Sequence, residues 1–246
     1  MKKSPILIDN KATEIIDQID YDFTSLKIPE KTNIMMCLRA KLIDDFVKNY
    51  LERSNGSVAL HLGCGLDSRY DRIGNSRVDW YDVDFPKVIT IRRRFYEETN
   101  HYHLIGSSVT DHAWMEKVPS GKGKYIVIAE GLFMYLTESE IKLLVKKLTE
   151  RLGNFTLVFD AFSVFAAKKV KDHPSIRKTG AVVHWGIDNP KELENWGPRI
   201  RLVDEKYFTA NKEIEKLDFG TRAAFKIANV FPIARNAHRV LIYQVG

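Results

Sequence analysis

The feature that most constrains this chain is a regular alternation of short apolar segments with helical patterns across its middle part. Each apolar segment has five or six residues and is rich in aromatic and β-branched side chains, which is typical of a buried β-strand. Five such segments lie at Val58–Leu62, Val78–Val83, Tyr102–Ser107, Tyr125–Glu130 and Thr156–Asp160. The alternation predicts an α/β fold, in which a parallel sheet is covered by helices on both faces.

Two segments carry strong helical signals. Glu138–Leu152 follows a capping box formed by Thr137 and Glu140, ends at Gly153, and carries its apolar residues on one stripe. Glu30–Glu52 has an apolar residue at every fourth position, and this ladder consists of Ile34, Leu38, Leu42, Phe46 and Tyr50. The first 55 residues are therefore predicted to be mostly helical.

Composition excludes several classes of protein. The chain of 246 residues is 44% hydrophobic and 28% charged, as in ordinary globular proteins, and no apolar run approaches the roughly 20 residues of a membrane span. Asp9 interrupts the first apolar stretch, which excludes a signal peptide and leads us to expect a cytoplasmic protein. The two cysteines, Cys37 and Cys64, have no metal-ligand or CxxC spacing, so we expect free thiols and no metal.

The formal net charge of +6 raises the question of a nucleic-acid partner. The 38 basic residues are spread along the chain, however, and the densest cluster, Arg92–Arg94, lies inside an amphipathic helical pattern that favours a solvated face. We therefore expect a small-molecule partner rather than nucleic acid or a membrane.

A sharp turn follows the first predicted strand at Gly63-Cys64-Gly65. Glycines at this place allow a tight turn and a close approach of a ligand to the backbone, beside the start of the next helix. A dinucleotide fingerprint requires a third glycine at position 68, where Ser68 stands, and this difference argues against a nicotinamide enzyme.

Three charged residues are candidates for a ligand site. Asp84 ends the second strand 21 residues after Gly63, close to the spacing at which an acid binds a ribose, although Asp82 points to the same face. Glu130 closes the fourth strand at the same expected edge of the sheet. Arg39 lies within the apolar stripe of the Glu30–Glu52 helix, where an arginine either extends to solvent or meets an anion.

Taken together, these segments resemble the leucine carboxyl methyltransferase family, and especially its tetracenomycin-type polyketide O-methyltransferase branch. The resemblance is carried by five stretches in the right order, with a weaker match at His184-Trp185-Gly186. The stretches are Leu38–Phe46 (LRAKLIDDF), Leu62–Arg72 (LGCGLDSRYDR), Trp80–Pro86 (WYDVDFP), Ser107–Trp114 (SSVTDHAW) and Ala129–Leu136 (AEGLFMYL).

The resemblance implies a Rossmann-like class I methyltransferase, with a seven-stranded, mostly parallel sheet whose last strand is antiparallel, and S-adenosylmethionine as the methyl donor. Arg39 would hold the cofactor carboxylate, Asp84 would bind the ribose hydroxyls, and Glu130 would complete the site. Gly63 and Gly65 would line the methionine portion. Ser108, which replaces a family aspartate, and the backbone of Val109 would contact the adenine.

The pattern along the chain, which has no linker, also predicts a single domain over residues 1–246 with four parts. Residues 1–55 would form a helical N-terminal cap, residues 56–162 the cofactor-binding core, residues 163–236 a substrate lid, and residues 237–246 a closing strand. The closing strand shows its apolar pattern at Val240–Val245.

The identity of the methyl acceptor stays open at this level. Members of the family methylate a protein carboxylate or an oxygen of a small molecule, and the compact chain favours a small, aromatic or polyketide-like acceptor over a protein; a cofactor-binding protein without transferase activity is a third possibility. A carboxylate needs no base, a hydroxyl does, and no spacing identifies one. The candidates for the acceptor site are Phe133, Tyr135, Phe162, His184 and Trp185.

Overall fold

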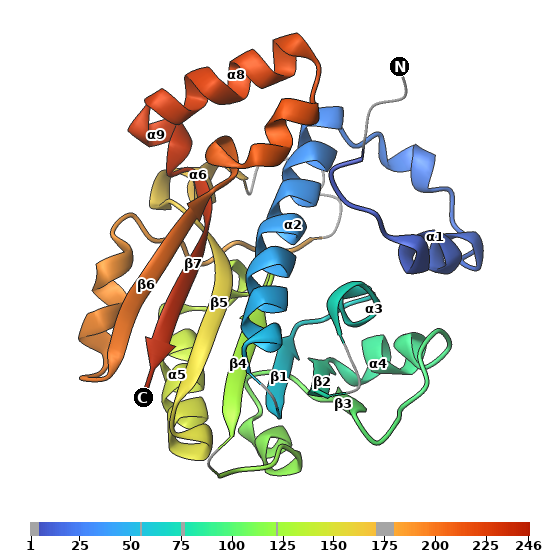
Figure 1. Ribbon diagram of the computed structural model, residues 1–246, viewed down its shortest axis with the longest axis vertical. Coiled ribbons are helices and arrows are strands. Elements are labelled where there is room, and N and C mark those ends of the chain that lie inside the picture. The colour runs from blue at the N-terminus through green and yellow to red at the C-terminus, as the bar shows by residue number, and fades with distance from the viewer. Residues whose placement is uncertain (1–4, 55, 75–76, 122, 171–179) are drawn as a thin grey trace.

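The computed structural model describes residues 5–54, 56–74, 77–121, 123–170 and 180–246, and these residues build one seven-stranded sheet (Figure 1). The strand order is β3-β2-β1-β4-β5-β7-β6. The strands are β1 Ser57–Leu62, β2 Asp79–Asp84, β3 Tyr102–Gly106, β4 Lys124–Ala129, β5 Phe155–Phe162, β6 Ile200–Tyr207 and β7 His238–Val245. The first five strands are parallel, and β7 lies antiparallel between β5 and β6. The predicted fold class is thus confirmed.

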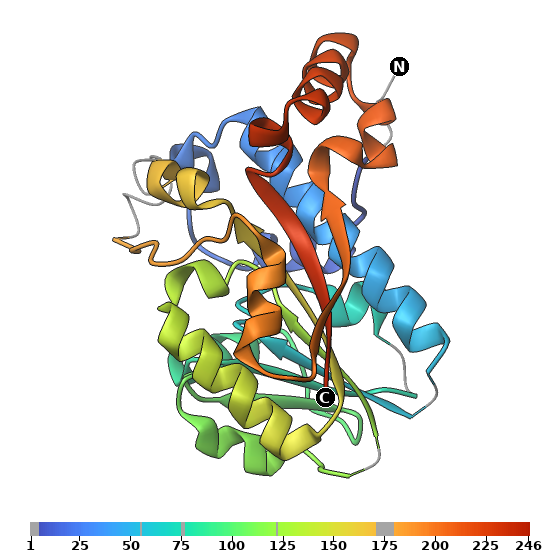
Figure 2. The ribbon, with the colours of Figure 1, turned by 90° about the vertical axis from the view of Figure 1, so that its left-hand side faces the viewer.

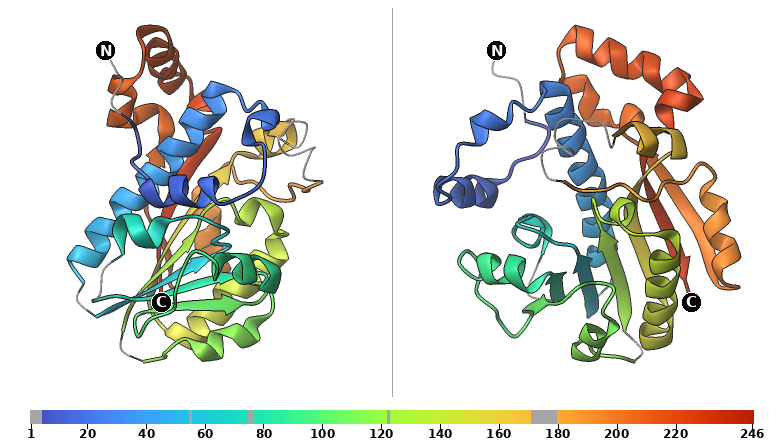
Figure 3. Two further views of the ribbon diagram at one scale, coloured as in Figure 1. Left: turned by 90° about the vertical axis from the view of Figure 1, so that its right-hand side faces the viewer. Right: turned by 180° about the vertical axis from the view of Figure 1, so that it is seen from behind.

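Helices cover both faces of this sheet. The α-helices are α1 Asn10–Asp17, α2 Glu30–Glu52, α3 Arg69–Ile73, α4 Pro86–Arg92, α5 Glu138–Leu152, α6 Val164–Val170, α8 Phe219–Val230 and α9 Pro232–Arg235. The described residues also contain six short 3₁₀ helices: η1 Phe23–Leu26, η2 His112–Lys117, η3 Phe133–Tyr135, η4 Pro190–Trp196, η5 Phe208–Ala210 and η6 Lys212–Lys216. Helix α5 and η4 lie on one face (Figure 2), and α2 and α3 lie on the other (Figure 3, left).

The two strongest helical signals predicted the observed bounds of α2 and α5. The capping box of Thr137 and Glu140 forms at the start of α5, where each side chain bonds to the backbone N–H of the other residue. In α2 the face that packs against the core is rotated relative to the predicted ladder of apolar residues. Of the five ladder residues only Leu38 is fully buried, and the remaining buried apolar contacts come from Ile43, Val47 and Leu51.

The division of the chain into four parts stays a prediction, and the structure adds to it at both ends. Helix α2 is more than a cap, because its buried side chains form one of the two hydrophobic cores together with β1, β4 and β7. Residues 163–236 were predicted to form a lid, yet they include β6, which pairs with β7 at the edge of the sheet. Four of the eight residues of this edge strand are charged, and all but Ile200 are at least partly exposed, which protects the strand from pairing with other chains and hides its strand pattern.

The basic cluster at residues 92–94 is only partly a solvated face, so that prediction was wrong for Arg92. This side chain is completely buried, and its Nη2 lies 2.5 Å from Oδ2 of Asp82, which is also completely buried. Arg93 is half-exposed, as predicted, and contacts Glu98. Both cysteines are free thiols. Among the described residues, no helix has both the length and the apolarity to cross a bilayer.

Candidate active site

The carboxyl ends of β1 and β2 form the centre of the candidate site. Gly63 and Gly65 adopt positive φ angles of 64° and 53°, and the N–H of Gly63 donates to the carbonyl of Val83 at 2.8 Å. A Cβ at position 63 would lie 3.0 Å from a methyl group of Leu132. Glycine at 63 is therefore favoured by the backbone conformation and by the close approach of Leu132, and it lines the cavity described below.

The acid at the tip of β2 is Asp84, whereas Asp82 has a structural role. The carboxylate of Asp84 is partly exposed and accepts N–H bonds from Gly65 and Phe85, each at 2.7 Å. Asp82 is fully buried and accepts from Trp80 Nε1 at 2.8 Å. Burial raises the pKa of Asp82, but the adjacent Arg92 guanidinium outweighs burial and holds that pKa below its usual value. Of the two acids, only Asp84 is free to bind a ligand.

Arg39 meets two carboxylates at the ends of β4 and β5. Its Nε donates to Oε1 of Glu130 at 2.7 Å, and its Nη1 lies 3.3 Å from Oδ2 of Asp160. Burial raises the pKa of Asp160, but Arg39 and His238 together hold it well below its usual range. The Cβ of a residue replacing Gly131 would lie 3.3 Å from Nη2 of Arg39, so this glycine makes room for the guanidinium.

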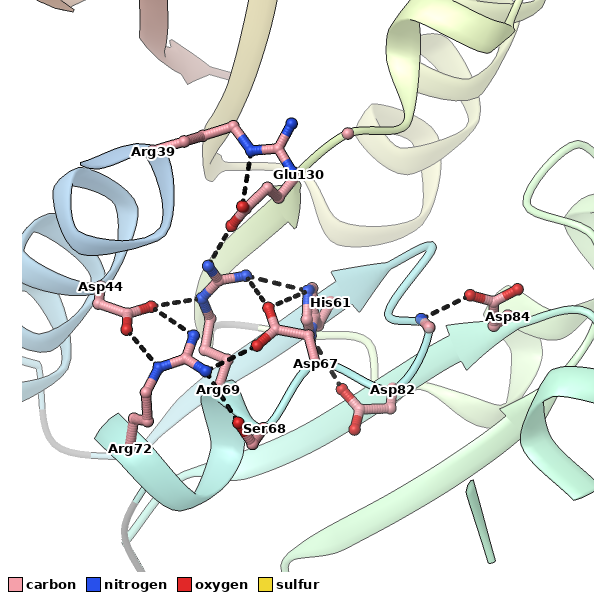
Figure 4. A network of polar contacts seen from close by, with 12 residues as sticks. Arg39, Asp44, His61, Asp67, Ser68, Arg69, Arg72, Asp82, Asp84 and Glu130 are labelled. Atoms are coloured by element: carbon pink, nitrogen blue, oxygen red, sulfur yellow. Dashed lines mark hydrogen bonds and ion pairs between the residues drawn. The ribbon is translucent and has the colours of Figure 1, made fainter. Parts of the chain in front are cut away.

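A larger ionic network extends from Glu130 toward α3 (Figure 4). Arg69 is completely buried, contacts Glu130, and binds Asp44 of α2 at 2.7 Å through Nε. Arg72 binds the other oxygen of Asp44 at 2.6 Å. Asp67 bridges the two arginines, at 3.0 Å from Arg69 and 2.8 Å from Arg72. These ion pairs hold α2 and α3 in fixed positions beside the Gly63 turn.

Sequence reasoning missed this network, because the LGCGLDSRYDR stretch was interpreted only through its glycines. A signal for the network was nevertheless present in the sequence. The arginines that follow the first buried strand need carboxylate partners, and the paired aspartates in LRAKLIDDF provide one of them, Asp44. His61 completes the network inside β1. Its Nε2 accepts from Arg69 at 3.1 Å, and its Nδ1 lies 3.2 Å from Asp82.

The N-terminal segment closes one side of the same space. Both oxygens of Asp9 accept from the hydroxyl of Ser68, at 2.5 and 2.6 Å, and one of them binds Arg72 at 2.7 Å. Ser68 therefore has a defined role at the position where a dinucleotide-binding enzyme would have glycine. Asp9 and Leu7 line a cavity of about 420 Å³ above the turn.

Four of the seven predicted cofactor residues line this first cavity: Arg39, Gly63, Gly65 and Glu130. Asp84 is joined to it through the N–H of Gly65. Ser108 and Val109 follow β3 at the same edge of the sheet but do not line the cavity. The Ser108 hydroxyl lies 2.8 Å from that of Thr110, and the Val109 side chain is buried.

A second cavity of about 610 Å³ adjoins the first, because Met36 and Arg39 line both. Its walls are mainly apolar and come from α2, η3, β5, α6 and α8. Of the five predicted acceptor residues, Tyr135 and Phe162 line it. The other three do not. Phe133 and Trp185 are core residues packed around Phe159, and His184 is exposed beside a separate surface cavity.

His238 is a wall residue of the second cavity that sequence reasoning did not identify. It is the first residue of β7, and its Nε2 lies 2.6 Å from Oδ2 of Asp160. The only available signal was an acid near the end of β5 and a histidine that begins the closing strand. A pattern of local spacing cannot show that these strands are neighbours, because 78 residues separate the pair.

The first cavity has the donors and acceptors that S-adenosylmethionine requires. Nη2 of Arg39 has no acceptor among the described residues and is not sealed from solvent, so it can meet a carboxylate. Asp84 can accept from ribose hydroxyls, and the open backbone at Gly63 can admit the methionine chain. The described residues contain no cluster of His, Cys, Asp or Glu side chains suited to a metal ion.

Comparison with known proteins identifies the family. A family model described as leucine carboxyl methyltransferase matches residues 6–149. The tetracenomycin polyketide synthesis O-methyltransferase TcmP of Streptomyces glaucescens is 34% identical over 97% of this chain and 88% of its own. The S-adenosyl-L-methionine-dependent methyltransferase dpfgK of Gibberella zeae is 28% identical over 94% of this chain and 85% of its own.

Solved structures show the same fold at low sequence identity. A DUF574-family protein of Streptomyces avermitilis superposes with a TM-score of 0.64 at 12% identity, with 96% of each chain covered. The magnesium protoporphyrin IX methyltransferase of Synechocystis, solved with S-adenosylhomocysteine, gives 0.54 at 11% identity, covering 96% of this chain and 93% of the other. The chain belongs to the leucine carboxyl methyltransferase family and is an S-adenosylmethionine-dependent O-methyltransferase.

Proposed function

We propose that the protein transfers the methyl group of S-adenosylmethionine to an oxygen of a small, apolar, aromatic or polyketide-like molecule bound in the second cavity. The observation that carries this proposal is the contact between the two cavities at Met36 and Arg39. A space lined by charged groups and suited to the cofactor there adjoins an apolar space suited to a flat hydrophobic acceptor. The name of TcmP, which refers to polyketide synthesis, points to the same class of acceptor.

In the first cavity the proposed roles follow the geometry. Nη2 of Arg39 binds the cofactor carboxylate, while Glu130 and Asp160 fix the orientation of the guanidinium. Asp84 binds the ribose hydroxyls, and the backbone at Gly63 and Gly65 lies along the methionine chain. Ser108 and Val109 contact the adenine from the adjoining loop.

The cofactor, when bound, supplies an electrophilic methyl group on a sulfonium, and the protein has to align an acceptor oxygen behind it. The apolar walls, including Tyr135 and Phe162, orient the acceptor and exclude water from the transfer. Positioning of this kind contributes most of the rate in a displacement that needs no covalent intermediate on the protein.

Two measurements test the proposed function. S-adenosylmethionine should stabilise the protein against unfolding by about 2.7 kcal/mol at 100 times its dissociation constant, and NAD should not. Labelled S-adenosylmethionine should then transfer its methyl to aromatic acceptors. A shift with NAD alone would contradict the cofactor assignment, and transfer to protein termini but to no small molecule would contradict the acceptor class.

A matched pair of phenylalanines tests the location of the acceptor. Phe162 lines the second cavity, whereas Phe165 is 61% exposed on α6 and does not line it. Phe162→Ala should raise KM for the acceptor about tenfold or more, since a well-packed aromatic contact is lost. Phe165→Ala should leave KM unchanged. Equal effects of the two substitutions would mean that the acceptor binds elsewhere.

A further inference from the structure

Helices α8 and α9 carry large apolar side chains that the fold leaves exposed. Of the large apolar side chains in the described residues, the three most exposed are Phe219, Val230 and Ile233, at 79%, 74% and 79%. Ile227 and Phe231 are exposed as well, at 61% and 59%. We call these five residues, which lie between positions 219 and 233, the α8–α9 face. An exposed apolar cluster of this kind marks a contact surface.

The helical repeat places the exposed apolar residues of α8 on one stripe. At 3.6 residues per turn, Phe219, Ile227 and Val230 lie within a sector of about 80°. Phe225 and Ala228 lie on the opposite side of the helix and line the second cavity. A helix at the surface of a globular protein normally has a polar outward face. Helix α8 is apolar on both faces, so its outward stripe needs a partner of its own.

The α8–α9 face lies beside the second cavity. Ala224 of α8 and Ala234 of α9 line this cavity and are themselves exposed, which indicates that the cavity reaches the surface along these two helices. Both helices lie at one end of the molecule (Figure 1). A partner on the α8–α9 face would therefore lie next to the opening of the second cavity.

Cations accompany the apolar side chains of this face. Arg222, Lys226 and Arg235 lie in the same two helices, and the chain has no Asp or Glu after Asp218. The carboxylate of Glu215 contacts both Lys226, at 2.7 Å, and Arg222, at 3.5 Å. One carboxylate is thus shared by two cations, and the face keeps a positive charge.

Helix α6, which forms another wall of the second cavity, has the same character. Lys168 and Lys169 are exposed on it, and its residues Val164–Val170 include no acid. Figure 1 shows α6 next to α9. Positive charge therefore extends to both sides of the cavity.

An anionic lipid surface matches both features of the α8–α9 face. Amphipathic helices that bind membranes place aromatic and aliphatic side chains at the boundary of the acyl chains, and lysine or arginine beside the phosphates. A second copy of the chain matches less well. A twofold contact would bring Arg222 and Lys226 of one copy near those of the other, while residues 219–246 provide no acid to pair with them.

We propose that the α8–α9 face docks on an anionic lipid bilayer and places the opening of the second cavity at the bilayer surface. Phe219, Val230 and Ile233 insert at the boundary of the acyl chains, and Arg222 and Lys226 bind lipid phosphates. The proposal departs from the expectation of no membrane partner, because composition does not show which apolar side chains the fold leaves exposed. Only the use of this cavity for a methyl acceptor rests on the proposed function.

The test measures binding of the whole chain to vesicles, without cofactor or acceptor. Co-sedimentation is compared for vesicles of phosphatidylcholine alone and for vesicles with about 30% phosphatidylserine. We expect binding to the mixed vesicles to be about tenfold tighter or more, since several cations face the lipid phosphates. This binding should weaken severalfold when NaCl is raised to about 0.5 M.

Two matched pairs of variants locate the contact. Val230→Ser should weaken binding to the mixed vesicles about fivefold to tenfold, because an inserted apolar side chain is lost. Val203→Ser changes a valine that is 60% exposed on β6 and should have no effect. Lys226→Gln should weaken binding about fivefold, and Lys146→Gln, at an exposed position of α5, should not. Denaturant unfolding should be unchanged in all four variants, since each side chain is exposed.

Each other outcome would overturn the proposal. Absence of binding to the mixed vesicles, or equal losses within each matched pair, would remove the bilayer as the partner. A dimer that Val230→Ser dissociates would assign the face to a second copy, and absence of both vesicle binding and dimerisation would leave a different protein as its partner. None of these measurements involves methyl transfer, so the proposed function can hold when docking fails. Vesicle binding by a protein that methylates no small molecule would have the opposite meaning.

Discussion

Replacement of Arg39 by methionine tests whether this side chain stabilises the fold, through a framework role, or only binds the cofactor. The guanidinium binds Glu130 at 2.7 Å and Asp160 at 3.3 Å, and only 17% of the side chain is exposed. If it served only the ligand, Arg39→Met would leave the free energy of unfolding unchanged. The observed contacts predict a loss.

The size of that loss follows from what the two carboxylates retain. A hydrogen bond to a charged group contributes about 1.5–3 kcal/mol, and the contact with Asp160 is long. Glu130 keeps Arg69, and Asp160 keeps His238 and the N–H of Gly131. We therefore expect Arg39→Met to lower the free energy of unfolding by about 3 kcal/mol, below the value for a fully stranded charge. Arg39→Lys should lower the free energy of unfolding by about half as much, because one ammonium group can bind one of the two carboxylates but not both.

Denaturant unfolding without ligand, followed by calorimetric titration with S-adenosylhomocysteine, measures both roles. Affinity should fall about 30- to 150-fold in Arg39→Met, through the loss of Nη2. Lys41→Met is the control, since Lys41 lies on the same helix in a surface ion pair worth less than about 1 kcal/mol. An unchanged free energy of unfolding in Arg39→Met would refute the framework role. An unchanged affinity for S-adenosylhomocysteine would show that Arg39 does not bind the cofactor.

The pH dependence provides an independent check on the same variant. The pKa of Asp160 is lowered in the folded protein, so its contribution to stability is present above the unfolded pKa of about 3.9 and is lost as the pH falls toward the folded value. The difference between wild type and Arg39→Met should accordingly be full at pH 7 and shrink below about pH 4. A difference that is constant over this range would mean that lost packing, not charge, explains the effect.

Three further substitutions have distinct expected outcomes. Asp84→Asn should weaken S-adenosylhomocysteine binding about tenfold by calorimetry with little change in unfolding, and unaltered affinity would rule out ribose contact. Asp82→Asn should instead lower the free energy of unfolding by about 3–5 kcal/mol, because a buried cation loses its partner, and a loss below 1 kcal/mol would contradict that pairing. Gly131→Ala should destabilise the protein more than Gly153→Ala, since both have positive φ but only the first meets Arg39; equal losses would leave backbone strain as the whole cause.

Much of the fold was predictable because its signals are local. The capping box at Thr137 and the stop at Gly153 define α5 within a few residues of chain, and the glycine turn follows a continuous apolar strand. The edge strand β6 was not predictable in the same way. Its pattern is set by exposure at the margin of the sheet, which depends on its neighbour β7.

The candidate site likewise has residues that the sequence predicts and contacts that it does not. Arg39, Asp84 and Glu130 were identified because each interrupts or ends an apolar pattern and because family motifs surround them. The link between His238 and Asp160 depends on two strands meeting across the sheet, and the burial of Arg92 depends on Asp82 beneath it. Contacts between distant segments of this kind leave no periodic trace in the sequence.

The ionic network around Arg39, Arg69 and Arg72 has a consequence for turnover. It contains five carboxylates, from Asp9, Asp44, Asp67, Glu130 and Asp160, and therefore two negative charges more than its three arginines carry. S-adenosylmethionine carries one net positive charge, and its demethylated product carries none. S-adenosylhomocysteine therefore neutralises the excess negative charge of the site less well than S-adenosylmethionine does. This difference favours replacement of the product by a new S-adenosylmethionine molecule after each transfer. Sinefungin, with the charge of the substrate, should bind more tightly than S-adenosylhomocysteine, and the opposite order would show that the excess charge is neutralised within the protein.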